Sequence, residues 1–132
     1  MNDLAAYRLQ SANERLMAAK DNIEKEHYKD AINRSYYAIF TAIRALLAER
    51  SVDFSRHSAV ISYFQREYIK TGIFDKKFSK YLQAAFEIRN DCDYADFFFA
   101  AREDAEEQYQ HAEEMTEAIR RYLENCQDMG EN

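Results

Sequence analysis

Apolar residues recur along this chain at alternating steps of three and four, the spacing of one buried face of an α-helix. The clearest stripe spans residues 3–26 and consists of Ala5, Leu9, Ala12, Leu16, Ala19 and Ile23. A second stripe spans residues 28–50 and consists of Ile32, Ser35, Ile39, Ala42 and Leu46, widened by Tyr36, Ile43 and Leu47. The pattern predicts two long helices, of which the second is the most buried.

The same rhythm continues after a predicted loop at residues 51–54. Ser55 is the expected N-cap of a shorter helix that Gly72 ends, and the apolar positions of this helix are Val60, Ile61, Phe64 and Tyr68. Asp75 is the expected cap of the next helix, whose stripe is Phe78, Leu82, Ala85, Arg89 and Cys92. The last helix is expected after Asp96, with Ala101, Ala105, Gln108, Ala112, Met115, Ile119, Tyr122 and Cys126 on one side. These segments predict an all-α fold, an antiparallel up-and-down four-helix bundle with an additional short helix, in a single domain over residues 1–132.

Composition supports the same fold class. The chain has 132 residues and a mass of 15.6 kDa, enough for one core. It contains no Pro and only two glycines, whereas a β-sandwich needs a turn signal every ~8–12 residues and a nucleotide-binding α/β fold needs a glycine-rich loop. Hydrophobic residues make up 47% and charged residues 32%, which excludes intrinsic disorder.

The sequence also bears on location and cofactors. It begins without a charged-then-apolar signal segment, and no apolar run approaches the ~18 residues that span a bilayer, so we expect a cytoplasmic protein with no membrane partner. Cys92 and Cys126 form no CxxC pair, and we expect two reduced thiols, with a disulfide between them as the alternative. His27, His57 and His111 have no metal-ligand spacing, so we predict no metal and no other cofactor.

Net charge is −6 and is unevenly distributed. Residues 1–66 carry 10 basic and 8 acidic side chains, a net charge of +2, whereas residues 67–132 carry 8 and 16, a net charge of −8. A general polyanion-binding protein has a basic surface, so any nucleic-acid role of this chain must rest on a local pocket. The acidic last helix has the composition of a solvated face that keeps the protein soluble.

Arg89 occupies a position in the fourth stripe where the spacing predicts an apolar side chain. A guanidinium directed towards a core needs partners, because an unpaired buried charge is strongly unfavourable. The acidic candidates follow at once, at Asp91, Asp93 and Asp96, with Tyr94 beside them. The spacing leaves two interpretations open: an Arg–Asp pair that locks this helix onto its neighbour, or an anion pocket for a phosphate.

A second polar interruption lies in the most apolar segment, at Ser35, Tyr36 and Tyr37. Adjacent tyrosines on a helix point about 100° apart, so one can face the core while the other faces a neighbouring surface. Because Tyr36 and Arg89 each interrupt a buried stripe, we expect them in the same cleft. The candidate ligand-binding residues are Arg89, Asn90, Asp93, Tyr94, Ser35, Tyr36 and Tyr37.

Three segments together resemble the prokaryotic HEPN domain family. Residues 33–40 (NRSYYAIF) are similar to its S-Y-Y-A-x-F signature, residues 64–72 (FQREYIKTG) to its F-x-x-x-F-V-K-T-G segment, and residues 89–94 (RNDCDY) to its R-x-x-x-D-Y. His57 stands where many of these small proteins place a basic residue or a histidine. The resemblance covers about residues 4–125, in order and with matching spacing.

The resemblance implies a helical bundle that forms a homodimer and is encoded beside a small nucleotidyltransferase in toxin–antitoxin-like pairs. Active members are metal-independent ribonucleases that use an R-x4-6-H motif at the dimer interface. Arg89 matches the arginine and Asn90 a common polar companion, but Tyr94 stands in the histidine window and the next histidine is His111. Tyr94 is also a candidate for a controlling modification by its position.

This departure bears on mechanism, because metal-free RNA cleavage needs a group that moves protons near neutral pH. A tyrosine with a pKa of about 10 is a poor general base, whereas Arg89 can still hold phosphate oxygens. We therefore expect a non-catalytic or degenerate family member that binds a nucleotide or RNA phosphate at Arg89 and partners a nucleotidyltransferase. The alternatives are a metal-independent ribonuclease that uses Arg89 with Tyr94 or His57, and a purely structural helical interaction domain.

Ten Tyr and nine Phe in so short a chain are more aromatic surface than a single bundle needs to bury. The run Phe97, Phe98 and Phe99 in particular exceeds what one helix face can cover. Together with the resemblance, this predicts a homodimer; the alternative is that these three side chains close the end of the bundle.

Overall fold

Five α-helices account for most of the chain. The computed structural model describes the backbone of residues 1–130 and the side-chain surroundings of residues 1–126. The helices are α1 (Asp3–Glu24), α2 (Tyr28–Glu49), α3 (His57–Phe64), α4 (Lys77–Tyr94) and α5 (Arg102–Gly130). A single π-helical turn over Gln65–Ile69 extends α3, and the described residues contain no strand. The predicted all-α fold is confirmed.

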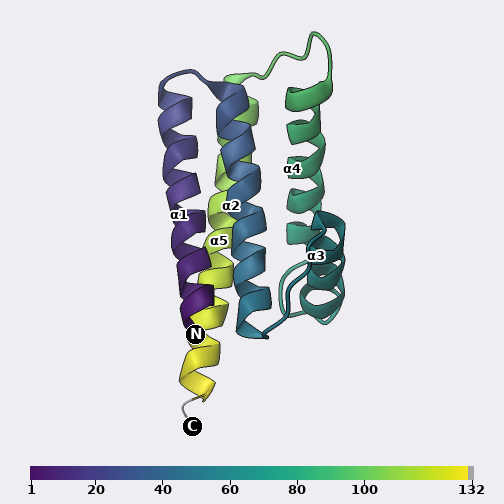
Figure 1. Ribbon diagram of the computed structural model, residues 1–132. Helices are drawn as coiled ribbons and strands as arrows, with labels where there is room; N and C mark the ends of the chain where they lie inside the picture. The colour runs from purple at the N-terminus through teal and green to yellow at the C-terminus, as the bar shows by residue number, and fades with distance from the viewer. Residues whose placement is uncertain (131–132) are drawn as a thin grey trace.

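The four long helices run in alternating directions, with α3 and its π-helical turn beside the first turns of α4 (Figure 1). Helix α2 contacts α1, α4 and α5, and α5 in turn contacts α1 and α4. Helices α1 and α4 therefore lie on opposite sides of the α2–α5 pair. The arrangement is an up-and-down helical bundle, as the four stripes predict: α1 and α4 run antiparallel to α2 and α5, while α2 and α5, which also contact each other, run in the same direction.

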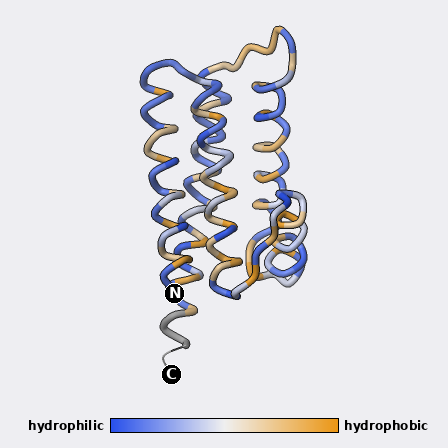
Figure 2. The backbone as a smooth tube through the Cα atoms, viewed as in Figure 1, coloured by the Kyte–Doolittle hydropathy of each residue, from blue (hydrophilic) through white to orange (hydrophobic). Residues whose placement is uncertain are grey.

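Helix α2 carries the largest part of the core, as its widened stripe predicts. Its buried residues are Ala31, Ile32, Ser35, Tyr36, Ala38, Ile39, Phe40, Ala42, Ile43, Ala45, Leu46, Leu47 and Ala48. Hydrophobic and hydrophilic positions alternate around each helix in Figure 2, the pattern of helices with one face towards a common core. A smaller cluster of Ile23, Ala31, Ile32, Ala100 and Ala105 closes the end of the bundle where α1 meets α2.

The helix starts differ from the sequence predictions at two places. The prediction that Ser55 caps α3 is wrong: Arg56 precedes the helix in extended conformation, and no side chain caps it. The loop is instead held by Asp53, whose carboxylate accepts the N–H of Phe54 at 2.9 Å and pairs with arginines of α1 and α2. Lys76 rather than Asp75 directly precedes α4, although Asp75 Oδ1 accepts the N–H of Lys77, the first residue of the helix, at 2.9 Å.

Helix α5 begins at Arg102 rather than directly after Asp96. Residues 95–101 form a connection in which Phe97 adopts a left-handed backbone with φ 60°. Asp104 then stabilises the first turn of α5 by accepting the N–H of Ala101 at 3.0 Å. This connection appears in Figure 2 as a hydrophobic segment outside the helices.

Both thiols, Cys92 and Cys126, are free. They lie towards the C-terminal ends of α4 and α5, and because these helices are antiparallel the two thiols are at opposite ends of the bundle. The expectation of two reduced cysteines is consistent with this placement. Among the described residues, no helix is both long enough and apolar enough to cross a membrane.

Candidate functional site

Arg89 of α4 is hydrogen-bonded to a tyrosine of α2. Its side chain is 18% exposed, and its Nη2 donates a hydrogen bond to the Tyr37 hydroxyl at 2.9 Å. The guanidinium carbon lies 5.2 Å from the centre of the Tyr36 ring and 5.4 Å from that of Tyr37, both within cation–π range. Arg89 and Tyr36 thus lie side by side, while the cleft expected around them stays a prediction.

The predicted Arg–Asp pair exists, but it lies within one helix. Asp93 Oδ2 is 3.1 Å from Arg89 Nε, one turn further along α4. The contact is an ion pair without a hydrogen bond, and Nε remains a buried donor with no acceptor in line. The hydrogen bond of Arg89 to α2 is therefore the one to Tyr37, and the Asp93 carboxylate lies next to Nε, where another anion could bind in its place.

Ser35 and Tyr36 lie in the core beneath this site. Ser35 is 0% exposed and Tyr36 is 1% exposed, and neither hydroxyl has a hydrogen-bond partner. Burial raises the pKa of Tyr36, and the opposing effect of the Arg89 charge is smaller. Tyr36 therefore stays protonated and supplies an aromatic surface to Arg89, while Tyr37 is the tyrosine of the pair that reaches the half-buried rim.

The other predicted residues of the R-x-x-x-D-Y segment lie further out. Tyr94, in the last turn of α4, is 76% exposed and makes no hydrogen bond with the described residues. Asn90 is half-buried beside Arg89 in sequence. Neither supplies a group that contacts the Arg89 guanidinium.

His57 comes to the same cluster from a different helix. It is the first residue of α3, and its ring centre lies 4.0 Å from that of Phe40 and 6.4 Å from that of Tyr37. Since Tyr37 also accepts the Arg89 hydrogen bond, one tyrosine of α2 connects the arginine of α4 with the histidine of α3. The fold thus joins two of the three catalytic candidates, Arg89 and His57, through Tyr37, and leaves Tyr94 outside.

Two cavities flank Tyr37, and the sequence analysis did not predict them. One has a volume of about 520 Å³ and the other about 360 Å³, and both are lined by Tyr37 and by Arg15 of α1. Their further basic lining residues are Arg34 in the larger cavity, and Arg8 and Arg44 in the smaller one. The sequence signal was present, because Arg8 and Arg15 are seven residues apart on α1 and Arg34, Tyr37 and Arg44 follow one face of α2.

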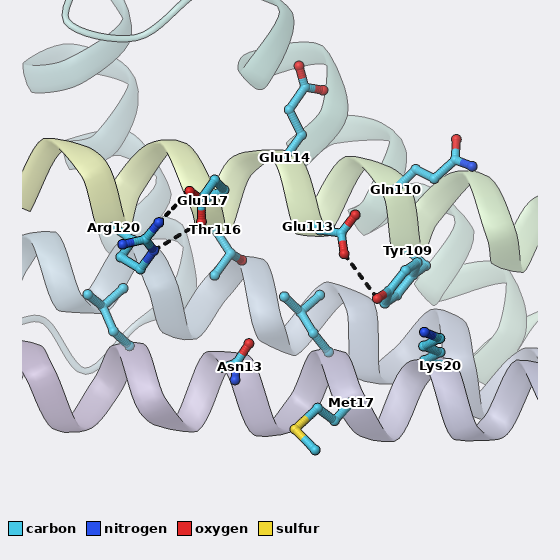
Figure 3. A pocket seen from close by; sticks show the side chains of 12 residues that line it. Asn13, Met17, Lys20, Tyr109, Gln110, Glu113, Glu114, Thr116, Glu117 and Arg120 are labelled. Atoms are coloured by element: carbon cyan, nitrogen blue, oxygen red, sulfur yellow. Dashed lines mark hydrogen bonds and ion pairs between the residues drawn. The ribbon is translucent and has the colours of Figure 1, made fainter.

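A larger hollow of about 620 Å³ lies between α1 and α5 (Figure 3). Its acidic groups already have partners within the chain: Glu117 binds Arg120, Glu113 accepts from the Tyr109 hydroxyl at 3.1 Å, and Glu114 pairs with Lys77 of α4. Glu114 and Glu117 are thus paired with basic side chains, whereas Glu113 and Lys20 of the lining form no ion pair among the described residues.

No metal centre is found among residues 1–126, since no three His, Cys, Asp or Glu side chains gather closely enough to hold an ion. His111, the histidine nearest after Arg89 in sequence, stacks on Tyr81 with ring centres 3.8 Å apart. It belongs to the α4–α5 interface rather than to the Arg89 cluster.

Comparison with known proteins agrees with the fold and with the motif segments. The model of the HEPN domain matches residues 5–122. A UPF0332 protein of Thermotoga maritima is 35% identical over 114 residues, which is 86% of this chain and 86% of that protein. Two proteins of Methanocaldococcus jannaschii, each named "putative toxin", are 31% identical, one over 74% of this chain and 67% of its own length, the other over 65% and 64%. The chain therefore belongs to the HEPN domain family.

Proposed function

We propose that this chain is a non-catalytic HEPN protein that holds a phosphate-bearing ligand, a nucleotide or RNA, at Arg89. The observation that carries the proposal concerns the Arg89 guanidinium: its Nε is buried without an in-line acceptor, and its one ion pair among the described residues is with the exposed Asp93. A phosphate that displaces Asp93 gains a charge-assisted hydrogen bond that the free protein lacks. Tyr37 holds the guanidinium in place for that exchange.

The absence of cleavage follows from the proton-transfer chemistry. Cutting RNA without a metal requires a group that takes the 2′-hydroxyl proton and another that protonates the leaving oxygen. Tyr94, which stands in the motif position of the histidine, is 76% exposed and forms no hydrogen bond with Arg89. The site keeps a phosphate-binding group and has no base at the motif position.

The partner proposals rest on the family and on the surface. The two toxin-named relatives support a role for this chain in a toxin–antitoxin-like module, and the family resemblance supports a nucleotidyltransferase as its partner there, in the cytoplasm. Phe97 and Phe99 are 104% and 84% exposed, so a homodimer that covers them would bury a large apolar area. Sedimentation equilibrium tests the homodimer, and a single species of 15.6 kDa at micromolar concentration counts against it.

A second candidate function is a metal-independent ribonuclease in which His57 is the base. The observation that favours it is the link from His57 through the Tyr37 ring to Arg89, which places a histidine and a phosphate-binding arginine in one cluster. An imidazole titrates near neutral pH and can both accept and return a proton.

Incubation of RNA with the protein in a metal chelator separates the two functions. The proposed function predicts intact RNA with the wild-type protein. The second candidate predicts cleavage that His57→Ala and Arg89→Gln both abolish, while His111→Ala, which changes a histidine outside the cluster, retains it. Circular dichroism of each variant shows whether the helical fold persists.

A further inference from the structure

The two cavities beside Tyr37 form one continuous basic surface on α1 and α2. Arg15 and Tyr37 line both of them, so the cavities adjoin along these two side chains. Apart from His57 of α3, the basic and aromatic lining residues belong to α1 and α2, two helices that pack along their length. Because backbone packing rather than a loop sets their spacing, the surface is preformed.

Two of the four arginines on this surface have no ion-pair partner among the described residues, and the other two share one carboxylate. Among residues 1–126, Arg15 and Arg34 form no ion pair, and the only hydrogen bond of the two is a long one, 3.4 Å, from Arg15 to the Ser11 carbonyl. Arg8 and Arg44 share a single carboxylate, Asp53, at 3.3 and 3.0 Å.

One carboxylate, Asp30, lines the larger cavity, and none lines the smaller. Four arginines thus line a surface with one lining carboxylate, Asp30, and a second carboxylate, Asp53, that pairs with two of them, on a protein whose net charge is −6. Such a concentration of positive charge favours an anion with more than one phosphate oxygen.

The smaller cavity adds an aromatic wall to these charges. Tyr37, Phe40 and His57 all line it, and the Phe40 and His57 rings are in contact, with centres 4.0 Å apart. Aromatic side chains next to a cationic groove are what a nucleobase needs, because a base stacks on a ring while its phosphate binds an arginine. An inorganic anion such as phosphate has no ring that could stack on these aromatic side chains.

We propose that this surface binds one nucleotide unit, either free or as part of an RNA strand. Arg15 and Arg34 hold its phosphates in the larger cavity, and its base packs against Tyr37 and His57 in the smaller one. The inference rests on the proposed function, because the ligand is again a phosphate-bearing one. It differs in where the phosphates bind: they contact arginines of α1 and α2 and not Arg89 alone. Arg89 then acts at the edge of the site, through its hydrogen bond to Tyr37.

The experiment compares two charge-matched double variants of the full chain. Arg15→Gln/Arg34→Gln removes the two arginines without ion-pair partners, and Arg66→Gln/Arg102→Gln removes two exposed arginines that line neither cavity. Each is titrated with ATP and with a single-stranded RNA of about ten nucleotides, at about 0.1 M ionic strength where distant charges are screened. Tyr37→Leu is titrated with ATP and with pyrophosphate, which has no base.

Three results are expected. The Arg15/Arg34 variant binds ATP or RNA at least about tenfold more weakly than the wild type, while the Arg66/Arg102 variant changes by less than about threefold. Tyr37→Leu loses about tenfold for ATP and much less for pyrophosphate. Binding of ATP identifies a free nucleotide as the ligand, and binding of RNA alone identifies a strand.

Three outcomes overturn the inference. Equal losses in the two double variants would show that only net charge matters. Wild-type affinity in the Arg15/Arg34 variant, together with lost binding in Arg89→Gln, would refute this placement of the phosphates and leave the proposed function standing. A wild-type protein that binds neither probe would refute both.

Discussion

The hydrogen bond between Arg89 and Tyr37 gives a sharp quantitative prediction. We expect it to stabilise the fold by linking α4 to α2, and a double-mutant cycle isolates that contribution. Arg89→Met keeps an unbranched apolar stem and removes the charge and the donors. Tyr37→Phe keeps the aromatic ring and removes the acceptor alone.

The magnitude follows from burial and geometry. The donor is charged, the distance is 2.9 Å and the Arg89 side chain is only 18% exposed, so a charge-assisted bond of about 1.5 kcal/mol is expected, the lower end of its range. The cation–π contact of Arg89 with the ring survives Tyr37→Phe and cancels in the cycle. The coupling free energy should therefore be about 1.5 kcal/mol, which corresponds to a few degrees in Tm for a chain of this length.

Urea unfolding followed by circular dichroism measures the four free energies of unfolding. A control cycle on Arg102 and Glu106, an exposed pair one helical turn apart on α5, should give a coupling of about 0.5 kcal/mol or less. Additive effects of Arg89→Met and Tyr37→Phe, within about 0.3 kcal/mol, would refute the interpretation that this bond joins the two helices.

Further predictions concern Asp93, two buried tyrosines and Phe97. Asp93→Asn should tighten phosphate binding about threefold, since it removes the charge that competes beside Arg89 Nε, and calorimetry showing weaker binding would contradict this. Burial raises the pKa of Tyr36 and Tyr68, so above a pH of about 10 these hydroxyls lose their protons in the unfolded chain before they do so in the folded protein. The free energy of unfolding therefore falls as the pH rises further, by up to about 1.4 kcal/mol per pH unit for each tyrosine. Urea titrations at rising pH should show a smaller slope for Tyr36→Phe than for the wild type, and an equal slope would be inconsistent with the predicted shift. Phe97→Gly should raise the free energy of unfolding of the monomer by about 0.5 kcal/mol, because it relieves a left-handed residue that is fully exposed, and a lowered Tm would disprove this.

The helices were predictable because burial in a bundle follows residue spacing. The stripe from Ala5 to Ile23 and the widened stripe of residues 32–47 are buried or half-buried at every position. The start of α5 was not predictable in this way. Residues 97–99 contain neither Gly nor Pro, and the break arises where Ala95 is extended and Phe97 is left-handed, conformations that no local residue type signals.

Half of the candidate site was predictable for a related reason. Arg89 and Tyr36 stand out because each breaks an apolar stripe, and a polar group in a stripe must meet another polar or aromatic group. Arg15 and Arg34 break no stripe, and each alone resembles an ordinary solvated side chain. Only the packing of α1 on α2 brings them to one cavity, and that pairing depends on the register of two helices, which spacing within a helix does not specify.

The central claim is that the chain binds phosphate through Arg89 without cutting RNA. The most direct test is one titration of a fluorescent RNA of about ten nucleotides in a metal chelator, read by anisotropy for binding and on a denaturing gel for length, with ATP titrated in parallel by calorimetry. We predict saturable binding of at least one of the two ligands, RNA of unchanged length, and about tenfold weaker binding by a folded Arg89→Gln variant. Shortened RNA, or equal binding by Arg89→Gln, would contradict it.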